Sequence, residues 1–381
     1  MSKAPKLRFP EFEGEWEEKE LGEVGDVTAS GDLEADSFSK ELTEQHIYPI
    51  YSNAIVDEGL YGYSTHFKHL PNSITITARG TLGVAFVRQT KFTGIGRLLV
   101  VSNIVNSDAS FLKENWNFLA KIPFENGGIP QLTAVKAKTI KLLYPSLEEQ
   151  QKIADCLSAL DEEIAAEEEA LETLKAYKKG LLQQLFPEGV SKSTPPPLIF
   201  NKLPKLRFAG FEGEWEEVKL GEICNITNGK ANVQDHIEGG RYPLFDRSEV
   251  VKASNEYFLD CETVILPGEG VRFTPKYYKG KFNLHQRAYA LKDFSCSGLF
   301  LYYAIYAKKD LLATKAVQST VLSLRLPILQ NFEICIPVDI AEQEKIANCL
   351  SSLDELIEAK NEKIKLLESY KKGLLQRMFV N

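Results

Sequence analysis

Two long segments of the chain place apolar residues at alternating spacings of four and three. The stripe in residues 147–186 is broken only at Glu167 and Lys178, and the stripe in 340–379 only at the corresponding Lys360 and Lys371. The apolar positions are Ile153, Leu157, Leu160, Ile164, Leu171, Leu174, Leu181 and Leu185, then Ile346, Leu350, Leu353, Ile357, Ile364, Leu367, Leu374 and Met378. This spacing predicts two coiled-coil helices, each about 60 Å long at a rise of about 1.5 Å per residue. Because neither stripe is stable in water alone, we expect the two helices to pair.

Both helical segments belong to a duplication that covers the chain. Residues 5–24 recur at 204–223 with 15 of 20 identical, and residues 147–186 recur at 340–379 with 23 of 40 identical. The Pro- and Ser-rich segment 188–203 is typical of an exposed connector. We therefore expect globular domains at 1–146 and 204–339, with the helices at 147–187 and 340–381. The repeated segments, which we call the frame, are similar in both halves, whereas the segments between them, which we call the blocks, differ. This arrangement indicates two modules that perform the same task on two targets.

The blocks themselves, 25–146 and 224–339, predict a mixed α and β fold. Short runs of β-branched and aromatic residues joined by Gly turns favour a twisted, largely antiparallel sheet. FLYYAIYAKKDLLATKAV, at 300–317, is the clearest helix outside the long pair. Overall, the fold class is α+β: two globular domains joined by a long antiparallel two-helix coiled coil, in a pseudo-twofold tandem repeat.

A polar pair is expected to fix the register of the two helices. Glu167 and Lys360 each lie near the midpoint of their own helix, so antiparallel pairing brings them face to face. A polar residue in such a seam favours one register more than it adds to stability. In the alternative, both long side chains extend to solvent.

Composition limits the classes of function. The 381 residues are 44% hydrophobic, which suits a multi-domain globular protein, and neither a signal peptide nor a membrane span is evident, so we expect the cytoplasm. The net charge of −8 disfavours nucleic-acid binding only if it is evenly spread. Segment 147–186 alone carries ten acidic against four basic residues, so the acid lies mostly in the frame. The six cysteines are dispersed, without metal-ligand spacing.

Basic and polar residues near predicted turns are the candidates for contact with a nucleic acid, because such side chains could follow phosphates and read base edges. Arg forks onto guanine and Gln onto adenine, whereas Lys more often meets phosphate. In block one the candidates are Arg79, Thr81, Arg88, Lys91, Arg97, Gln131, Thr133, Lys136 and Lys138. In block two they are Arg272, Lys276, Tyr277, Lys279, Lys281, His285, Arg287, Gln318, Ser319 and Thr320. The alternative for each is a solvated surface residue, and for His285 a packed core histidine; Trp16 and Trp215 are expected to anchor the frame.

The repeated motifs resemble a known family. EEQQKIADCLSALDEEI with YKKGLLQQLF, their copies EQEKIANCLSSLDELI and YKKGLLQRMF, and PKLRF to GEWEEVKLGEI before each block are similar to the specificity subunit of a type I restriction-modification system. The resemblance covers essentially the whole chain. It implies that each block is a target recognition domain for one half of a split double-stranded DNA sequence. It also implies that the helices form a ruler for the gap between the halves.

The resemblance further implies partners and cofactors. The family's subunit docks two methyltransferase subunits and, through them, restriction subunits, which supply the S-adenosylmethionine, ATP and magnesium chemistry of DNA methylation and cleavage. This chain is expected to hold no cofactor and no catalytic residue, in keeping with the absence of a GxxxxGK[ST] or NPPY-type motif. Polar positions on the helices, including Lys178, Lys179, Lys371 and Lys372, are expected to remain free for the partner.

Two other classes of protein remain as alternatives from the residues. A bivalent protein–protein scaffold with a coiled-coil spacer would also explain the duplication, and the overall acidity suits it. A nuclease acting alone would need clustered carboxylates, but the visible clusters at 161–163 and 167–169 lie on the helix and suit a solvated face.

Overall fold

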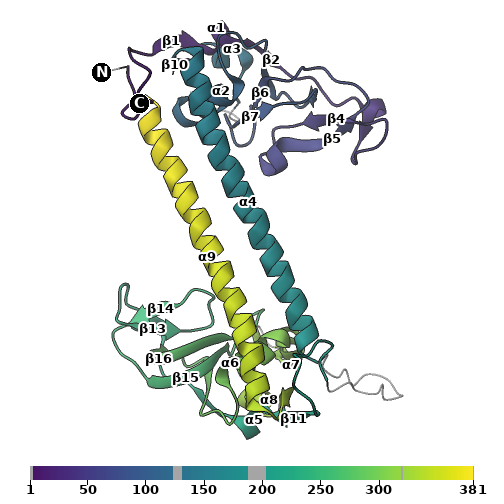
Figure 1. Cartoon of the computed structure of the whole chain (residues 1–381), viewed down its shortest axis with the longest axis vertical. Helices are drawn as coiled ribbons and strands as arrows, with labels where there is room; N and C mark the ends of the chain where they lie inside the picture. Colours follow the sequence, from purple (N-terminus) through teal and green to yellow (C-terminus); the bar gives the residue numbers. More distant parts are fainter. Residues whose placement is uncertain (1–2, 123–130, 188–202, 319–320, 381) are drawn as a thin grey trace. The chain divides into compact units, whose positions relative to one another are not determined.

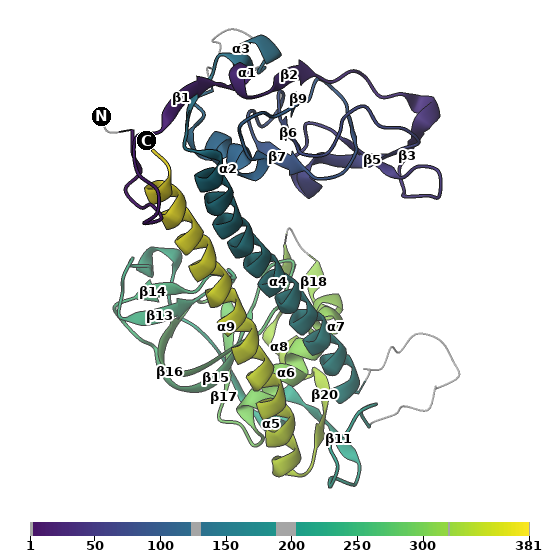
Figure 2. The same cartoon turned by 45° about the horizontal axis from the view of Figure 1, so that its top comes forward.

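The chain forms two compact units. The computed structural model describes residues 3–122, 131–187, 203–318 and 321–380. Unit 1 comprises Met1–Glu168 with Glu362–Asn381, and unit 2 comprises Glu169–Asn361. Each unit therefore holds one variable block, part of the long helix α4 (Leu147–Leu185) and part of the long helix α9 (Ile340–Met378) (Figures 1 and 2). The connector at 188–203 falls, except for Leu203, outside the described residues.

Inside each unit the two long helices run antiparallel. In unit 1, Lys363 Nζ lies 2.8 Å from Glu167 Oε1, and Lys371 Nζ lies 2.6 Å from Asp161 Oδ1. The α9 numbers rise as the α4 numbers fall, which defines the direction. The predicted seam positions are buried or half-buried, including Leu157 and Leu350. The antiparallel helical pair expected from the sequence is thus confirmed.

Unit 1 is built on short, largely antiparallel strands with short helices beside them. One sheet has the order β2–β9–β6–β7, another β3–β5–β4–β8, and β1 pairs with β10. The strands are β1 (Glu17–Glu20), β2 (Asp26–Ala29), β3 (Phe38–Ser39), β4 (Tyr48–Tyr51), β5 (Leu60–Ser64), β6 (Ser73–Ile76), β7 (Ala85–Arg88), β8 (Thr93–Gly94), β9 (Leu99–Ser102) and β10 (Lys141–Tyr144). The helices are α1 (Leu21–Val24), α2 (Ala109–Leu119) and α3 (Ala134–Lys138). Asp108 caps the start of α2, where its carboxylate accepts from the N–H groups of Ser110 and Phe111.

Unit 2 repeats this plan with longer central strands. Its main sheet has the order β12–β17–β15–β16–β13–β14, β11 pairs with β20, and β18 pairs with β19. The strands are β11 (Trp215–Lys219), β12 (Asn225–Asn228), β13 (Tyr242–Phe245), β14 (Lys252–Ser254), β15 (Leu259–Pro267), β16 (Lys276–Leu284), β17 (Ala288–Lys292), β18 (Val317–Gln318), β19 (Leu322–Ser323) and β20 (Glu333–Pro337). The helices are α5 (Leu220–Ile223), α6 (Gly298–Ala307), α7 (Lys309–Lys315) and α8 (Leu326–Gln330).

The mixed, largely antiparallel fold expected for the blocks is confirmed, with two refinements. β4 pairs with β8, and β13 with β16, in parallel. The helix predicted at 300–317 is two helices, α6 and α7. They meet at Lys308, whose φ of −105° and ψ of 12° leave the helical range.

A buried ion pair explains the repeated frame motifs. In unit 1 the Glu149 carboxylate is 1% exposed and receives the Arg8 guanidinium through two bonds of 2.8 and 2.7 Å. In unit 2, Glu342 and Arg207 form the same pair with two bonds of 2.7 Å. The PKLRF and EQ motifs therefore hold each helix start against its own domain.

The end of each long helix completes the core of a unit. In unit 1, Phe379 packs against Trp16 and Phe111, with ring centroids 6.1 and 5.5 Å away. In unit 2, Phe186 packs against Trp215 and Phe300 in the same way, at 6.5 and 5.5 Å. Trp16 and Trp215 are each 1% exposed, so their expected anchoring role is confirmed. None of the helices that the structure describes combines the length and the apolar character that a membrane crossing requires.

Candidate nucleic-acid interface

In unit 1, loops that are distant in sequence meet around one half-buried side-chain amide, that of Asn53. The Asn53 side chain, which follows β4, accepts from the Ala78 N–H at 2.7 Å and donates to the Gly96 carbonyl at 2.7 Å. The Leu132 N–H in turn donates to the Ala78 carbonyl at 3.0 Å. Arg79, Arg97 and Gln131 each neighbour one of these joined residues and are exposed. The loops that carry three predicted contact residues are therefore joined in one cluster.

The corresponding loops of unit 2 meet around a carboxylate. Glu269, after β15, contacts Nη1 of Arg287 with both oxygens, at 3.0 and 2.7 Å, and Nη1 of Arg247 at 3.3 Å. The Leu324 N–H donates to the Gly268 carbonyl at 2.8 Å, as Leu132 does to Ala78 in unit 1. The β18–β19 hairpin thereby lies beside the Arg287 turn.

Arg97 and Arg287 occupy equivalent positions. The Ile95 N–H donates to Tyr51 O, and the His285 N–H donates to Phe245 O, both at 2.9 Å, so each turn leaves its parallel strand in the same way. The turns then close through Leu98 N–H to Ile95 O at 3.2 Å and Ala288 N–H to His285 O at 2.9 Å. Both arginines are exposed, and Arg97 has a φ of 69°, an unusual value for a residue other than glycine.

Sequence reasoning overlooked the residues that join these loops. Asn53, Arg247 and Glu269 were not among the candidates for DNA contact. A usable signal existed, because aligning YPIYSN with YPLFDR places Asn53 opposite Arg247. Glu269 had no such signal, since an acidic residue does not suit a phosphate-binding surface.

Arg88 does not fit its predicted role in DNA contact, because it lies in the core of unit 1. Its side chain is 2% exposed, and its guanidinium lies 3.5 Å from the centre of the Tyr51 ring. Nε donates to Thr75 Oγ1 at 3.0 Å, and Nη1 donates to Glu58 Oε2 at 3.0 Å. Burial lowers the pKa of Arg88, against the opposing effects of Tyr51 and Glu58. Arg88 therefore has a structural role and is not available to DNA in this structure.

Three candidates of block two are also tied into the fold. His285 is 7% exposed, and its Nδ1 accepts from the Arg287 backbone N–H at 3.1 Å, so the core alternative for this residue is confirmed. Lys276 is half-buried and donates to Ser248 O at 2.5 Å. The Tyr277 hydroxyl donates to Glu262 Oε1 at 2.7 Å. These side chains have structural roles in the domain. Their exposed neighbours are the better candidates for direct contact.

The remaining candidates are exposed but lie at several places. Thr81 and Arg272 are exposed in the turns that follow β6 and β15, and Gln318 is exposed in β18. Lys91 lies 4.5 Å from the centre of the Phe67 ring, and Lys281 lies 4.8 Å from that of Tyr257. Lys279 is exposed in β16, whereas Ser319 and Thr320 fall outside the described residues. The structure therefore joins only part of the predicted set.

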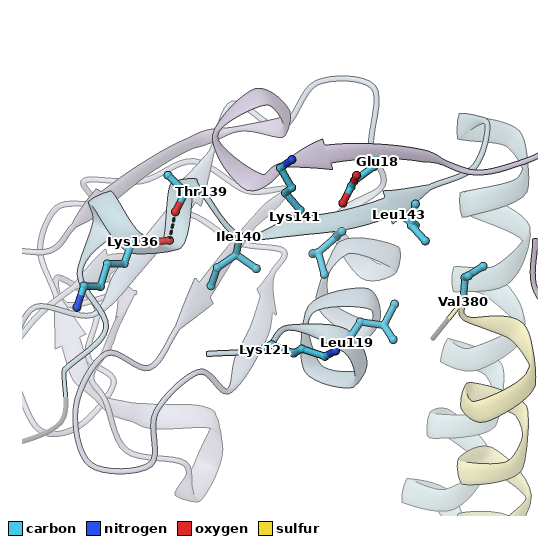
Figure 3. A pocket seen from close by; sticks show the side chains of 10 residues that line it. Glu18, Leu119, Lys121, Lys136, Thr139, Ile140, Lys141, Leu143 and Val380 are labelled. Carbon is cyan, nitrogen blue, oxygen red and sulfur yellow. Dashed lines mark hydrogen bonds between the residues drawn. The ribbon is translucent and has the colours of Figure 1, made fainter. Parts of the chain in front are cut away.

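The candidates around α3 border a basic hollow in unit 1. Thr133 caps α3 by accepting from the Lys136 N–H at 3.3 Å, and Lys138 packs beside Gly22. Figure 3 shows Lys136 and Lys141 at this hollow of about 580 Å³. Its lining is Glu18, Leu119, Lys121, Lys136, Thr139, Ile140, Lys141, Leu142, Leu143 and Val380.

The charge of this hollow is not shared by the two units. In the strand register, Lys141 of β10 lies opposite Glu20 of β1. At the equivalent place in unit 2, Glu333 of β20 lies opposite Lys219 of β11. The two positions therefore carry opposite charges. A function common to both units is better served by the loops around Arg97 and Arg287.

The lysines expected to remain free on the long helices divide into two kinds. Lys178 forms an ion pair with Asp354, and the equivalent Lys371 contacts Asp161. Burial would lower the pKa of Lys371, but the Asp161 and Glu114 carboxylates outweigh it and raise that pKa. The expectation that Lys178 and Lys371 are free is therefore wrong, because they stabilise the helical pair. Lys179 and Lys372 are exposed, as expected.

The predicted pairing of Glu167 with Lys360 is tested only in part. Glu167 accepts from Lys363 at 2.8 Å, and Glu163 lies 3.0 Å from the same Nζ atom. Glu167 thus has an α9 partner within unit 1. Its pairing with Lys360 would join residues of different units and stays a prediction.

Fold and loop clusters together define a class: a protein with two similar units, each presenting an arginine-bearing cluster, connected by long paired helices. The chain belongs to the family described as the type I restriction modification DNA specificity domain, whose model matches residues 13–176 and 212–369. The resemblance seen in the repeated motifs is thereby confirmed, and with it the assignment as a type I specificity protein for DNA target recognition.

Individual relatives agree with this assignment. The chain is 30% identical over 146 residues to the EcoDI specificity subunit of Escherichia coli, covering 38% of this chain and 32% of that protein. It is 27% identical over 298 residues to the MjaVIII specificity subunit of Methanocaldococcus jannaschii, covering 69% and 67%. The match thus spans about a third of the length of one of these relatives and about two thirds of the other. An S subunit structure from M. genitalium has a TM-score of 0.72 at 17% identity, over 99% of both chains, which shows a shared fold.

Proposed function

We propose that this chain reads a split double-stranded DNA sequence, with unit 1 and unit 2 each recognising one half. The observation that carries this proposal is the pair of equivalent loop clusters around Arg97 and Arg287. Their positions are the same, but their neighbours differ, as expected of two readers with different targets. Arg side chains at exposed turns suit guanine edges, and nearby Lys side chains suit phosphates.

Two methyltransferase subunits dock on the long helices at the repeated YKKG motif. Tyr177 and Tyr370 are equivalent and each 58% exposed. Gly180 and Gly373 follow them, and a Cβ added at either would meet no atom within 4 Å. Glycine inside a helix costs about 0.5–1 kcal/mol relative to alanine, so stability does not account for these two residues. Close approach of a partner backbone does account for them, and two equal surfaces suit two copies of one partner.

The chain acts as the non-catalytic member of a complex in the cytoplasm. Restriction subunits join through the methyltransferase subunits, and S-adenosylmethionine, ATP and magnesium are bound by those partners. In the residues that the structure covers, no group of His, Cys, Asp and Glu is arranged to hold a metal ion. A solved structure that concerns complex assembly of the type I R-M system shares the fold, with a TM-score of 0.51 at 17% identity.

The test is coexpression with the neighbouring methyltransferase subunit in a host that lacks this modification, followed by mapping of modified adenines. Methylation confined to one split motif is the expected result. DNA binding by the complex should also weaken steeply with salt, because phosphate contacts release counterions. If the two proteins copurify but no motif is modified and DNA binding does not depend on salt, a bivalent protein scaffold would be favoured instead.

A further inference from the structure

Glu269 is out of place on a surface that meets DNA. It lies between two exposed arginines, and its own side chain is 22% exposed. A carboxylate there repels phosphates and so lowers DNA affinity. Exposed ion pairs contribute little to stability, so the fold gains little from this arrangement. Its cost to DNA binding therefore requires another explanation.

The contacts of Glu269 restrict the orientation of both guanidinium groups. Both carboxylate oxygens contact Nη1 of Arg287, and Oε2 also lies 3.3 Å from Nη1 of Arg247. The backbone of Arg287 is held as well, by its N–H bond to His285 Nδ1 at 3.1 Å. Among the described residues, no hydrogen bond is seen from Nε or Nη2 of Arg287. That edge of the guanidinium is oriented and available.

We propose that Glu269 is a positioning residue for sequence reading, which aims Arg287 and Arg247 at guanine in the half-site of unit 2. A guanidinium recognises guanine by forking onto O6 and N7, and this fork requires a fixed orientation. Phosphate contact has no such requirement. The inference rests on the proposed function and adds to it which residue confers discrimination.

The equivalent cluster of unit 1 has a side-chain amide at the position of Arg247. There Asn53 fixes the backbone on either side of the cluster, through Ala78 and Gly96, and Arg97 follows directly. Asn53 therefore holds the backbone beside Arg97, whereas Glu269 contacts the Arg287 side chain itself. Removing the Glu269 charge should affect only the half-site that unit 2 reads, which makes the other half an internal control.

The experiment compares the full chain with Glu269→Gln, each coexpressed with the neighbouring methyltransferase subunit, by mapping modified adenines across the genome. We expect one half of the motif to lose its guanine requirement, with discrimination against single mismatches reduced about tenfold or more. The other half and the gap should not change. Nonspecific DNA binding by the complex should be equal or tighter, because a negative charge has been removed.

Three further variants provide a control and two independent checks of the same contact. Glu238→Gln removes an exposed charge with no ion pair in the described part of unit 2, and should leave the motif intact. Glu269→Asp retains the charge and should restore much of the discrimination. Arg287→Lys keeps the positive charge but loses the fork, and should relax the same half even if Glu269→Gln folds poorly.

The outcomes separate this inference from the proposed function. An unchanged motif in both Glu269→Gln and Arg287→Lys would overturn the positioning role while leaving the reader model intact. Equal loss of both half-sites would overturn it too, because a purely structural role affects the whole protein. If the unaltered chain modifies no split motif, the proposed function itself fails.

Discussion

At the scale of single residues, burial separates arginines that a sequence motif cannot distinguish. Arg88 and Arg97 both lie in the stretch of block one that carries its Gly turns, yet Arg88 is 2% exposed and Arg97 is exposed. Arg88 is the last residue of β7, where its side chain points to Thr75 and Glu58. The strand register decides this direction, and the register depends on pairing with β6.

This difference gives a first prediction. Arg88→Ala should lower the free energy of unfolding by about 2–4 kcal/mol, because it leaves buried hydrogen-bond partners unsatisfied. Arg97→Ala should change it by less than about 0.5 kcal/mol but abolish or relax the half-site of unit 1. Urea denaturation and adenine mapping measure the two effects. The assignment fails if Arg97→Ala is the destabilised variant.

A second prediction concerns pH. Burial lowers the pKa of His285 below the ordinary 6.5, with Asp246 opposing and Arg247, Arg287 and Lys252 reinforcing the shift. The unfolded chain then takes up a proton that the folded chain excludes. Stability from this group is complete above pH 6.5 and is lost as the pH falls through the lower, folded-state value.

The measurement is the free energy of unfolding from pH 7.5 to 5, in the full chain and in His285→Asn. The loss of stability on acidification should be smaller in the variant. His236→Asn replaces an exposed histidine of the same unit and serves as the matched control. Identical slopes in all three proteins would show that His285 does not carry the effect.

At the scale of elements, the sequence predicted the long helices well because their information is local. The heptad spacing and the duplicated motifs lie within single segments, and α4 and α9 follow them. The loop clusters are different, since Asn53, Ala78, Gly96 and Leu132 meet only through long-range strand pairing. Glu269 was missed for the same reason, because its partners follow β13 and β16 rather than its own strand.

The repeated glycines give a prediction at this scale. Gly180→Ala with Gly373→Ala should raise stability by up to about 1 kcal/mol per site, because alanine is the better helix former and nothing obstructs its Cβ. The same double variant should bind the methyltransferase subunit more weakly. Thermal unfolding of the chain and copurification of the partner measure the two effects. Tighter or unchanged binding would remove the YKKG surface from the docking model.

At the scale of the whole molecule, duplication with divergence is the central feature. The frames of the two units share the Arg8–Glu149 and Arg207–Glu342 pairs and the aromatic contacts of Phe379 and Phe186. The loops inserted in these frames differ in charge and length. This separation of a constant support from variable contacts is what allows each block to specify its own half-site.

The most direct test of this account is to replace block 25–146 with a second copy of block 224–339 and to map modified adenines in the presence of the methyltransferase subunit. The account predicts that the half-site of unit 1 disappears and that the half-site of unit 2 appears twice. Because the duplication predicts a pseudo-twofold arrangement, the two copies should form an inverted repeat. A motif that keeps its original first half would contradict the claim that each block reads its own half of the DNA target.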